Sequence, residues 1–450
     1  MRSVLPVVLV LAACVGGGTV DPEPGIEGDD GKGDGFGVRV DLADPTGPGF
    51  TRYAGDAARS PITLSVANRM HEIAARRARD EQMFMKVGAS GTVSTNLLHC
   101  FAGATQPRYR LDLAGRDGLL GTIEHFRQGR IGAATPFDRV TLAAMIGRTA
   151  AWVQTGSPSA LTRELAATNP RFAFVNYGTN DMEMGTSYAT ALPAFHEQLS
   201  RLLDRLEREG VVPIITGLNP RADSAEAARW VPTFDAMTRG MAEARQLPYI
   251  SLYRSTSSLP GIGLGSDGLH GNVFTELGAA QPCVFAAPAL QFNYNVRNLL
   301  SIEALDAARR VLLDGEDPPE AASLPAVAGD GSRERPFVID RLPFTHNFDT
   351  RRGASLVSRW SCGSQNEGGP EVYYRLSLDA PVTVRAAVLH RKPVDVDLHI
   401  GDFTGGCAAR ADVVIERALS AGDHAVVVDS FVSSTGRSNE GEYLFVVHAL

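Results

Sequence analysis

The sequence predicts an α/β domain built on a parallel sheet, followed by an all-β domain. From about residue 50 to 312, apolar strand-like runs alternate with segments of helical periodicity. This alternation is typical of a parallel sheet covered by helices on both faces, a three-layer α/β/α arrangement. After residue 335, short β-rich runs separated by turn residues predict a β-sandwich. The 450 residues are enough for two or three domains.

The first 14 residues, MRSVLPVVLVLAAC, predict a signal peptide. Their apolar run fits a secretory signal and is too short to span a bilayer, which takes about 20 residues. The residues LAAC resemble a bacterial lipobox, in which Cys14 becomes the lipidated first residue; an unlipidated signal with a chance cysteine is the alternative. Residues 15–50, rich in Gly, Pro and acidic residues, are expected to form a disordered tether. We therefore expect an exported bacterial lipoprotein of the cell envelope, at the outer membrane or cell surface, whose only membrane attachment is its lipid.

Residues 51–313 form the predicted α/β domain. Ser60 is a candidate N-cap with Pro61 at the first helical position, and apolar residues follow at helical spacing. Residues 191–210 place five apolar side chains on one face of another helix, which Gly210 can close. The remaining expected elements are strands at 83–87, 172–177, 211–216 and 248–253, helices near 139–153 and 295–312, and two segments that shape the pocket, 96–138 and a loop at 218–246.

Residues 314–335 are rich in Pro, Gly and Ala and predict a linker. Residues 336–450 form the predicted β-sandwich, an accessory domain. Its expected strands are the runs EVYYRLSL, VTVRAAV, DVDLHI, HAVVVD and EYLFVV. Several of these runs alternate between apolar and polar residues, as strands with one buried face do.

Charge and cysteine content exclude some function classes. The net charge of −8 argues against nucleic acid as a partner, because binding to phosphates needs a basic surface. Four cysteines remain after Cys14, and an even number in an exported chain suggests two disulfides. Three pairings are possible, and domain position favours Cys100–Cys283 with Cys362–Cys407. These spacings are unlike those of zinc sites, so we expect no metal and no cofactor.

Three short stretches of the α/β domain carry groups that could do chemistry. They are KVGASGTVS with Ser90, YGTND with Asn180, and GSDGLHGN with Asp267 and His270. Each alone could be an ordinary turn. Together they supply what acyl transfer needs: a hydroxyl nucleophile, a base, a carboxylate that orients the base, and an amide that donates to the oxyanion. Ser94 is the rival nucleophile.

These motifs resemble the SGNH, or GDSL-like, hydrolase family. The matching blocks are GAS at 88–90, GTND at 178–181 and DGLH at 267–270, with Gly147 in AAMIGRTA as the second-block glycine. The resemblance implies an oxyanion hole made of the Ser90 and Gly147 backbone N–H groups and the Asn180 side chain. Ala89 departs from the family pattern, which has an Asp there, and this puts the rigidity of the loop and the placement of the nucleophile in question.

The β-sandwich is similar to the pre-peptidase C-terminal-like domains appended to secreted bacterial enzymes, some of which bind calcium. Asp395, Asp397 and Asp402 could supply oxygen ligands or be ordinary strand and loop acids.

The sequence therefore predicts a secreted serine esterase that hydrolyses carboxylic esters through an acyl-Ser90 intermediate. Candidate substrates are acetyl or short-chain acyl esters of carbohydrate or lipid. The alternatives are a catalytically inactive SGNH scaffold that acts as a surface binding lipoprotein, and an O-acyltransferase that passes the acyl group to a sugar hydroxyl.

Overall fold

The structure is a computed structural model and describes residues 39–450. Cys14, the predicted signal peptide and most of the predicted tether lie outside the described residues. Residues 39–50, which were expected to belong to the tether, pack on the folded chain: Val40 is buried, and the Ala43 N–H donates to the carbonyl of Ala244 at 2.9 Å. The packed chain therefore begins before the expected boundary at residue 51.

The α/β domain is built on a four-stranded sheet in the order β1-β2-β3-β4, with all strands parallel. The strands are β1 (Asp80–Gly88), β2 (Pro170–Asn176), β3 (Val212–Thr216) and β4 (Tyr249–Ile250). Their central residues are buried, which explains why the sequence shows continuous apolar runs here rather than alternation. All four strands overlap the expected ranges.

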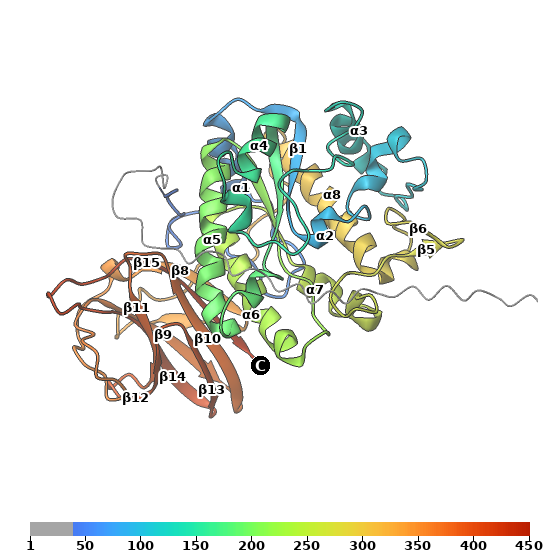
Figure 1. Cartoon of the computed structure of the whole chain (residues 1–450). Helices are drawn as coiled ribbons and strands as arrows, with labels where there is room; N and C mark the ends of the chain where they lie inside the picture. Colours follow the sequence, from blue (N-terminus) through green and yellow to red (C-terminus); the bar gives the residue numbers. More distant parts are fainter. Residues whose placement is uncertain (1–38) are drawn as a thin grey trace, which may run out of the picture. The chain divides into compact units, whose positions relative to one another are not determined.

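Helices cover both faces of this sheet. They are α1 (Leu64–Ala75), α2 (Ser90–Val93), α3 (Leu120–Gln128), α4 (Ala160–Thr168), α5 (Tyr188–Arg208), α6 (Ala225–Arg245), α7 (Leu252–Thr256) and α8 (Asn293–Leu312). Figure 1 shows the sheet between α4 and α5 on one side and α3 and α8 on the other. Short 3₁₀ segments span His99–Thr105, Asp117–Leu119, Trp152–Gln154, Asp181–Glu183, Pro260–Gly263, Ala289–Gln291 and Thr350–Arg352. The predicted three-layer arrangement is confirmed.

Two helix predictions are corrected. The first helix begins at Leu64 rather than Pro61, because Thr63 is the N-cap and its side chain accepts a hydrogen bond from the Val66 N–H. The expected helix near 139–153 is absent: the chain there forms turns and one 3₁₀ segment. Gly147 has a φ of 75°, a left-handed conformation that interrupts a right-handed helix.

The expected loop at 218–246 is mostly helix, namely α6. Its buried residues include Asp235, Arg239, Glu243 and Arg245, so its inner face does not appear as an apolar stripe in the sequence. Glu243 accepts a hydrogen bond from Thr345 of the second domain at 3.4 Å, whereas Asp235 and Arg245 are buried by partners within the α/β domain.

The C-terminal domain is a β-sandwich of two sheets. One has the order β13-β10-β15-β8 and the other β12-β11-β14-β9-β7. The strands are β7 (Phe337–Ile339), β8 (Phe344–Asp349), β9 (Glu371–Leu378), β10 (Val382–His390), β11 (Val396–Gly401), β12 (Cys407–Ala411), β13 (Val414–Leu419), β14 (Gly422–Ser430) and β15 (Glu442–Ala449). A small two-stranded sheet of the α/β domain adds β5 (Thr275–Glu276) and β6 (Ala279–Ala280). The predicted all-β domain is confirmed.

The sandwich packs on the α/β domain through its first sheet, and residues 39–450 form one compact unit. Helix α6 contacts β8 and β15, and α5 contacts β10. Apolar side chains of the sheet, such as Leu389 and Leu444, belong to the same continuous core as the helices. A Cβ at Gly240 of α6 would lie 2.8 Å from Leu444, so the absent side chain lets α6 approach the sheet closely.

Buried ion pairs accompany this apolar contact. Arg245 of α6 pairs with Asp204 at 2.7 Å and Glu207 at 2.6 Å, both on α5. Arg391, which follows β10, reaches the other oxygen of Asp204 at 2.7 Å. Removing one partner of such a network leaves a buried charge unpaired, a change that costs about 3–5 kcal/mol. The network thus links α5 and α6 of the first domain to the end of β10 in the second domain.

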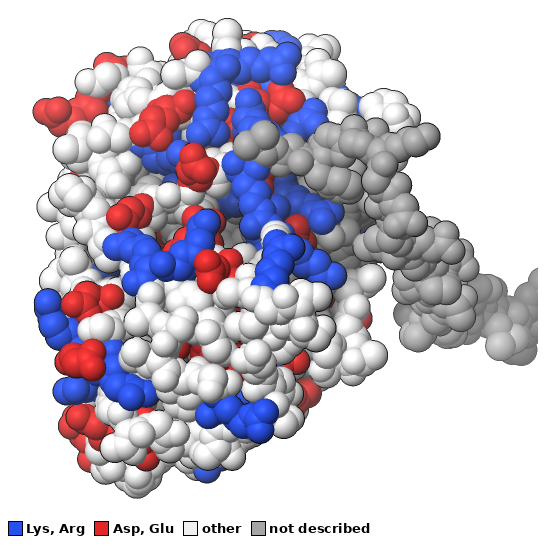
Figure 2. All heavy atoms as spheres, turned by 90° about the vertical axis from the view of Figure 1, so that its left-hand side faces the viewer, with Lys and Arg blue, Asp and Glu red and all other residues white. Residues whose placement is uncertain are grey.

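The surface displays both signs of charge. In Figure 2, Lys and Arg side chains gather over the upper part of one face, with Asp and Glu among them. On α5 such residues are paired: Glu197 meets Arg201 and Arg391, at 2.7 Å and 3.1 Å, and Glu209 lies 3.0 Å from Arg205. In the part of the chain that the structure describes, no helix combines the length and the apolar character that a membrane span requires.

Both expected disulfide pairings are confirmed. Cys100 and Cys283 are joined with their Cα atoms 5.7 Å apart, and Cys362 and Cys407 with theirs 5.4 Å apart. The first closes a separation of 183 residues within the α/β domain and the second one of 45 residues within the sandwich. Each loop closure stabilises the fold by about 2–4 kcal/mol.

Glu243, buried at the interface, should make the stability of the fold depend on pH. We expect its replacement to weaken this pH dependence. Burial, opposed by Arg239, raises the pKa of the Glu243 carboxyl to about 7. Between its ordinary value and about 7 this group ionises in the unfolded chain but stays protonated in the folded one, so folding loses stability as pH rises through that window. We expect the melting temperature of the wild type to fall more steeply from pH 5 to pH 8 than that of Glu243→Gln.

Glu72→Gln is the control, because the Glu72 side chain on α1 is 63% exposed. Thermal unfolding at several pH values measures all three proteins. Parallel pH profiles of the wild type and Glu243→Gln would contradict the prediction.

Candidate active site

The nucleophile turn follows directly from the end of β1. Gly88 is the last residue of the strand, and Ser90 is the first residue of α2. A Cβ at Gly88 would lie 2.2 Å from the Thr92 hydroxyl and 2.6 Å from the Asn176 carbonyl, so no other residue fits. The absence of a side chain permits this close approach, and the chain passes from the end of β1 into α2, so Ser90 lies at the carboxyl end of the strand.

Ser90, His270 and Asp267 form one hydrogen-bonded chain. His270 Nε2 lies 2.8 Å from Ser90 Oγ, and His270 Nδ1 lies 2.6 Å from Asp267 Oδ2. The other carboxylate oxygen of Asp267 accepts hydrogen bonds from the backbone N–H groups of His270 and Leu269, each at 3.0 Å. The structure therefore brings together all three residues predicted as catalytic.

Asp267 is held in its ionised form. Desolvation acts against ionisation, but hydrogen bonds from the His270 backbone and ring and from Leu269 lower the pKa of the Asp267 carboxyl to about 2. An ionised Asp267 accepts a hydrogen bond from Nδ1–H of His270, which keeps the proton on Nδ1 and leaves Nε2 free to accept the serine proton. The side chains of His270 and Asp267 are 43% and 52% exposed, so the site is open to solvent.

The loop that carries Asp267 and His270 is anchored on its neighbours. The Gly268 carbonyl accepts N–H groups of Ala222 and Asp223, at 2.8 Å and 3.2 Å, from the segment that precedes α6. Within the loop, the Gly265 N–H donates to the His270 carbonyl at 2.8 Å. The base and its orienting acid are therefore fixed by backbone contacts.

The predicted oxyanion donors lie in two loops that are bonded to each other. Gly147 sits in a turn that begins at Met145, whose N–H donates to the Gly88 carbonyl at 3.2 Å. Asn180 follows β2, and its Nδ2 donates to the Arg148 carbonyl at 3.0 Å. The Gly147 turn thus contacts the nucleophile turn on one side and the Asn180 loop on the other.

Asp181, the last residue of GTND, stabilises this arrangement. Its carboxylate accepts the Ala150 N–H at 2.8 Å and the Gly178 N–H at 3.0 Å. It therefore joins the segment that follows Gly147 to the loop that carries Asn180. Its position in the motif directly after Asn180 was the only sequence signal for this role.

Sequence reasoning also missed Arg297 and Asn176. Arg297 on α8 is 2% exposed and donates to the Gly91 carbonyl at 3.3 Å and to Asn176 Oδ1 at 3.0 Å. Asn176, the last residue of β2, in turn donates to the Gly217 carbonyl at 3.0 Å. Arg297 thus links the nucleophile turn, through Gly91, to the end of β2. The signal available was the polar run NYNVRN at the start of an otherwise apolar helix.

Ser94, the rival nucleophile, accepts the Asn96 N–H at 3.3 Å and lies at the end of α2. The imidazole of His270 is bonded to Ser90 instead. Ala89, where the family has Asp, is partly buried against the core. The hydrogen bond between Ser90 and His270 forms without a carboxylate at that position.

Residues 114–273 match the family model described as GDSL-like lipase/acylhydrolase. The matched range contains Gly147, Asn180, Asp267 and His270 and begins after Ser90. The resemblance expected from the sequence motifs is confirmed by this match, which supports an ester-hydrolysing serine hydrolase. No match to a curated protein is found.

Several solved structures are similar to parts of the chain. A GDSL-like lipase from Bacteroides thetaiotaomicron is 15% identical with a TM-score of 0.32, and the match covers 54% of this chain and 98% of that one. The pre-peptidase C-terminal domain of a Bacillus anthracis collagenase is 12% identical with a TM-score of 0.17, covering 24% and 89%. A two-domain esterase active on acetylated mannans is 10% identical with a TM-score of 0.28, covering 85% and 95%.

Replacing Arg297 should slow ester hydrolysis without weakening substrate binding. Arg297→Lys keeps the charge but loses the two-pronged contact with Gly91 and Asn176. We expect kcat to fall about tenfold or more with little change in KM, because a small displacement of the nucleophile turn misaligns Ser90. Arg310→Lys, a half-exposed position on the same helix, is the control. An unchanged kcat and an unchanged rate of labelling by a fluorophosphonate probe, together with a lower melting temperature, would show that Arg297 serves stability only.

Proposed function

We propose that the protein is an exported serine esterase that hydrolyses carboxylic esters through an acyl-Ser90 intermediate. The observation that carries this proposal is the continuous hydrogen-bonded chain from Ser90 through His270 to Asp267, at 2.8 Å and 2.6 Å. Such a chain couples a hydroxyl nucleophile to a base whose tautomer is fixed, and these are the requirements of acyl transfer.

In the first half of the reaction, Ser90 Oγ attacks the carbonyl carbon of the ester and His270 Nε2 takes the serine proton. The negative charge that develops on the carbonyl oxygen is stabilised by the backbone N–H groups of Ser90 and Gly147 and by Asn180. The Asn180 amide has two N–H donors, and one of them is committed to the Arg148 carbonyl. The other remains for the oxyanion, so the same bond that orients the amide leaves its catalytic donor available.

The protonated imidazole then donates its proton to the leaving alcohol, and the C–O bond of the ester breaks. In the second half, His270 takes a proton from a water molecule, which attacks the acyl-serine. The proton returns to Ser90 Oγ as the carboxylic acid leaves. Ionised Asp267 stabilises the positively charged imidazole in both halves.

The exposure of the site supports substrates with a large alcohol portion, such as acetyl or short-chain acyl esters of a carbohydrate or a lipid. His270 and Asp267 are open to solvent, so a chain much larger than the acyl group can lie across them. In the loop that leads to Gly147, Met145 is 45% exposed and Ile146 is 69% exposed. Met184, four residues after Asn180, is 50% exposed. These side chains offer apolar contact surface at the rim.

Catalysis should depend on Ser90 and His270 as a unit. Ser90→Ala and His270→Ala should each remove most turnover of a short aryl ester, and the double variant should be hardly worse. Asn180→Ala should lower kcat by about 100-fold or more and change KM less, because its donor acts mainly in the transition state. Ser94→Ala is the control and should remain active.

Stopped-flow release of the alcohol and labelling by a fluorophosphonate probe measure the acylation of Ser90. A wild type that hydrolyses no ester of increasing acyl length and takes up no probe would be an inactive scaffold that binds ligands at the surface. Acylated sugar formed in preference to free acid, when a sugar acceptor is added, would make the protein an O-acyltransferase.

We further propose that the chain is a lipoprotein of the cell envelope, anchored through Cys14. The support is the LAAC run after a short apolar segment. Because one acyl chain binds membranes only weakly, stable anchoring requires more than one chain on this residue. In detergent phase partition, the wild type should enter the detergent phase and Cys14→Ser the aqueous phase. Recovery of both in the aqueous phase would contradict the anchor.

A further inference from the structure

A group of buried polar side chains lies in the β-sandwich, outside the candidate active site. Residues 353–370, called the strap below, connect the 3₁₀ segment Thr350–Arg352 to β9 and contribute Trp360, which packs on side chains of β9 and β14. Three side chains meet here: Glu367 of the strap, His399 of β11 and Asp429 of β14, which are 2%, 1% and 0% exposed. One donor atom of each lies within 4.8 Å of those of the other two.

The inner atoms of these side chains have no hydrogen-bond partner among the described residues. They are both carboxylate oxygens of Glu367, Oδ1 of Asp429 and Nε2 of His399. Each buried polar atom left without a partner costs about 1–3 kcal/mol. Unpartnered atoms on three buried residues, each with a donor atom within 4.8 Å of those of the other two, indicate a ligand shared by the group.

The outer atoms of the same side chains are held in place. Asp429 Oδ2 accepts the Trp360 indole N–H at 2.6 Å, and the His399 ring stacks on Trp360 with centroids 4.8 Å apart. The group is therefore oriented by neighbouring side chains in the way that ligands of a bound ion are oriented by their surroundings.

The charge balance of the group is negative. Asp397 lies beside it and pairs with Arg410 at 2.7 Å, and the same guanidinium lies 3.5 Å from Glu367 Oε1. Ionised Glu367, Asp397 and Asp429 would face this one buried cation, with an excess of two negative charges. Either protons or a divalent cation must therefore compensate the charge.

We propose that Glu367, His399 Nε2 and Asp429 bind one divalent transition-metal ion of the zinc class. An imidazole nitrogen with two carboxylates is a typical ligand set for such an ion, whereas calcium takes six to eight oxygen ligands. Zinc binds nitrogen and oxygen at about 2.0–2.2 Å, so three donors as much as 4.8 Å apart would each need to move inward by up to about 0.7 Å. This assignment departs from the sequence-based expectation of no metal.

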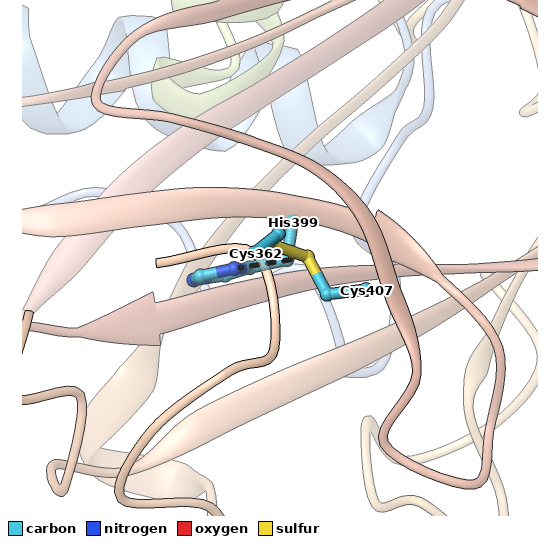
Figure 3. A group of neighbouring side chains, drawn as sticks. All are labelled: Cys362, His399 and Cys407. Atoms are coloured by element: carbon cyan, nitrogen blue, oxygen red, sulfur yellow. Dashed lines mark hydrogen bonds between the residues drawn. A yellow bond between two sulfur atoms is a disulfide. The ribbon is translucent and has the colours of Figure 1, made fainter. Parts of the chain in front are cut away.

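The neighbouring cysteines are not part of the proposed site. Figure 3 shows His399 beside the disulfide between Cys362 and Cys407, with Nδ1 facing the sulfur of Cys407 at 3.9 Å. Disulfide sulfurs are not thiolates and do not serve as strong metal ligands. The other ring nitrogen, Nε2, is the one without a partner. The metal would add a second link between the strap and the sheet, independent of the disulfide.

The calcium ligands considered from the sequence are engaged elsewhere. Asp402 accepts the Thr404 N–H at 2.8 Å and the Gly406 N–H at 3.0 Å and caps a turn, and Asp397 is bonded to Arg410. Asp395, Asp397 and Asp402 do not form one of the metal-compatible groups found among residues 39–450.

The experiment uses the untagged, disulfide-intact protein, stripped of metal and titrated with Zn²⁺ by calorimetry, with thermal unfolding as a second readout. We expect about one equivalent to bind and the melting temperature to rise, because the ion binds the folded state. Glu367→Gln and His399→Gln should each weaken binding at least about tenfold and lose the thermal shift. Metal-free Glu367→Gln should melt no lower than the metal-free wild type, because it removes one of the excess negative charges while Arg410 keeps its pair with Asp397.

Asp412→Asn is the matched control: Asp412 also pairs with Arg410, at 2.6 Å, but is 75% exposed, and its variant should bind Zn²⁺ normally. His270→Ala should also bind normally, which separates this site from the active site. Failure of the wild type to bind Zn²⁺, binding of Ca²⁺ in its place, or binding that appears only after reduction and disappears in Cys362→Ser would each overturn the proposal.

Discussion

The candidate active site depends on a steric constraint at the carboxyl end of β1. Gly88 lies so close to Thr92 and to the Asn176 carbonyl that a single extra carbon would collide with both. Only glycine therefore fits where β1 passes into α2, the helix whose first residue is Ser90. The carbonyl of the same glycine accepts the Met145 N–H, which aligns the loop of Gly147 with the nucleophile. The nucleophile turn and the loop of Gly147, a predicted oxyanion donor, thus meet at one residue without a side chain.

The second domain influences the first through α6 rather than through the site. One face of this helix packs on β8 and β15. The segment before the helix donates two backbone hydrogen bonds to the Gly268 carbonyl, in the loop that carries His270. Buried pairs such as Arg245 with Asp204 hold the helix against α5. The sandwich therefore belongs to the packed framework that holds the His270 loop, and it is more than a module joined by the linker at 314–335.

The sequence was sufficient for features that follow from local pattern. Apolar runs located the strands. The combination of GTND and DGLH, in this order and at this separation, located Asp267 and His270, and the resemblance that these motifs carry pointed to Ser90. The sequence was insufficient where contacts between distant segments determine which residues are buried. Helix α6 carries Arg239 and Glu243, which look like surface residues in the sequence but are buried. Arg239 donates to the Tyr53 carbonyl, and Glu243 meets Thr345 of the second domain. The segment near Gly147 has helical periodicity, but its backbone turns instead to bring an N–H group toward the nucleophile.

The two polar groups of this protein differ in a way that indicates different roles. In the active site, Ser90, His270 and Asp267 satisfy one another and remain open to solvent, so a proton can move along the chain while substrate enters. Beneath the strap, by contrast, His399 and Asp429 are fully buried with unpaired atoms that face each other. A buried group that lacks partners cannot exchange substrate with solvent, and its unpaired atoms are costly unless a ligand fills the space. Such an arrangement suits a permanently bound ion that stabilises the accessory domain, whereas the open and fully paired triad suits turnover.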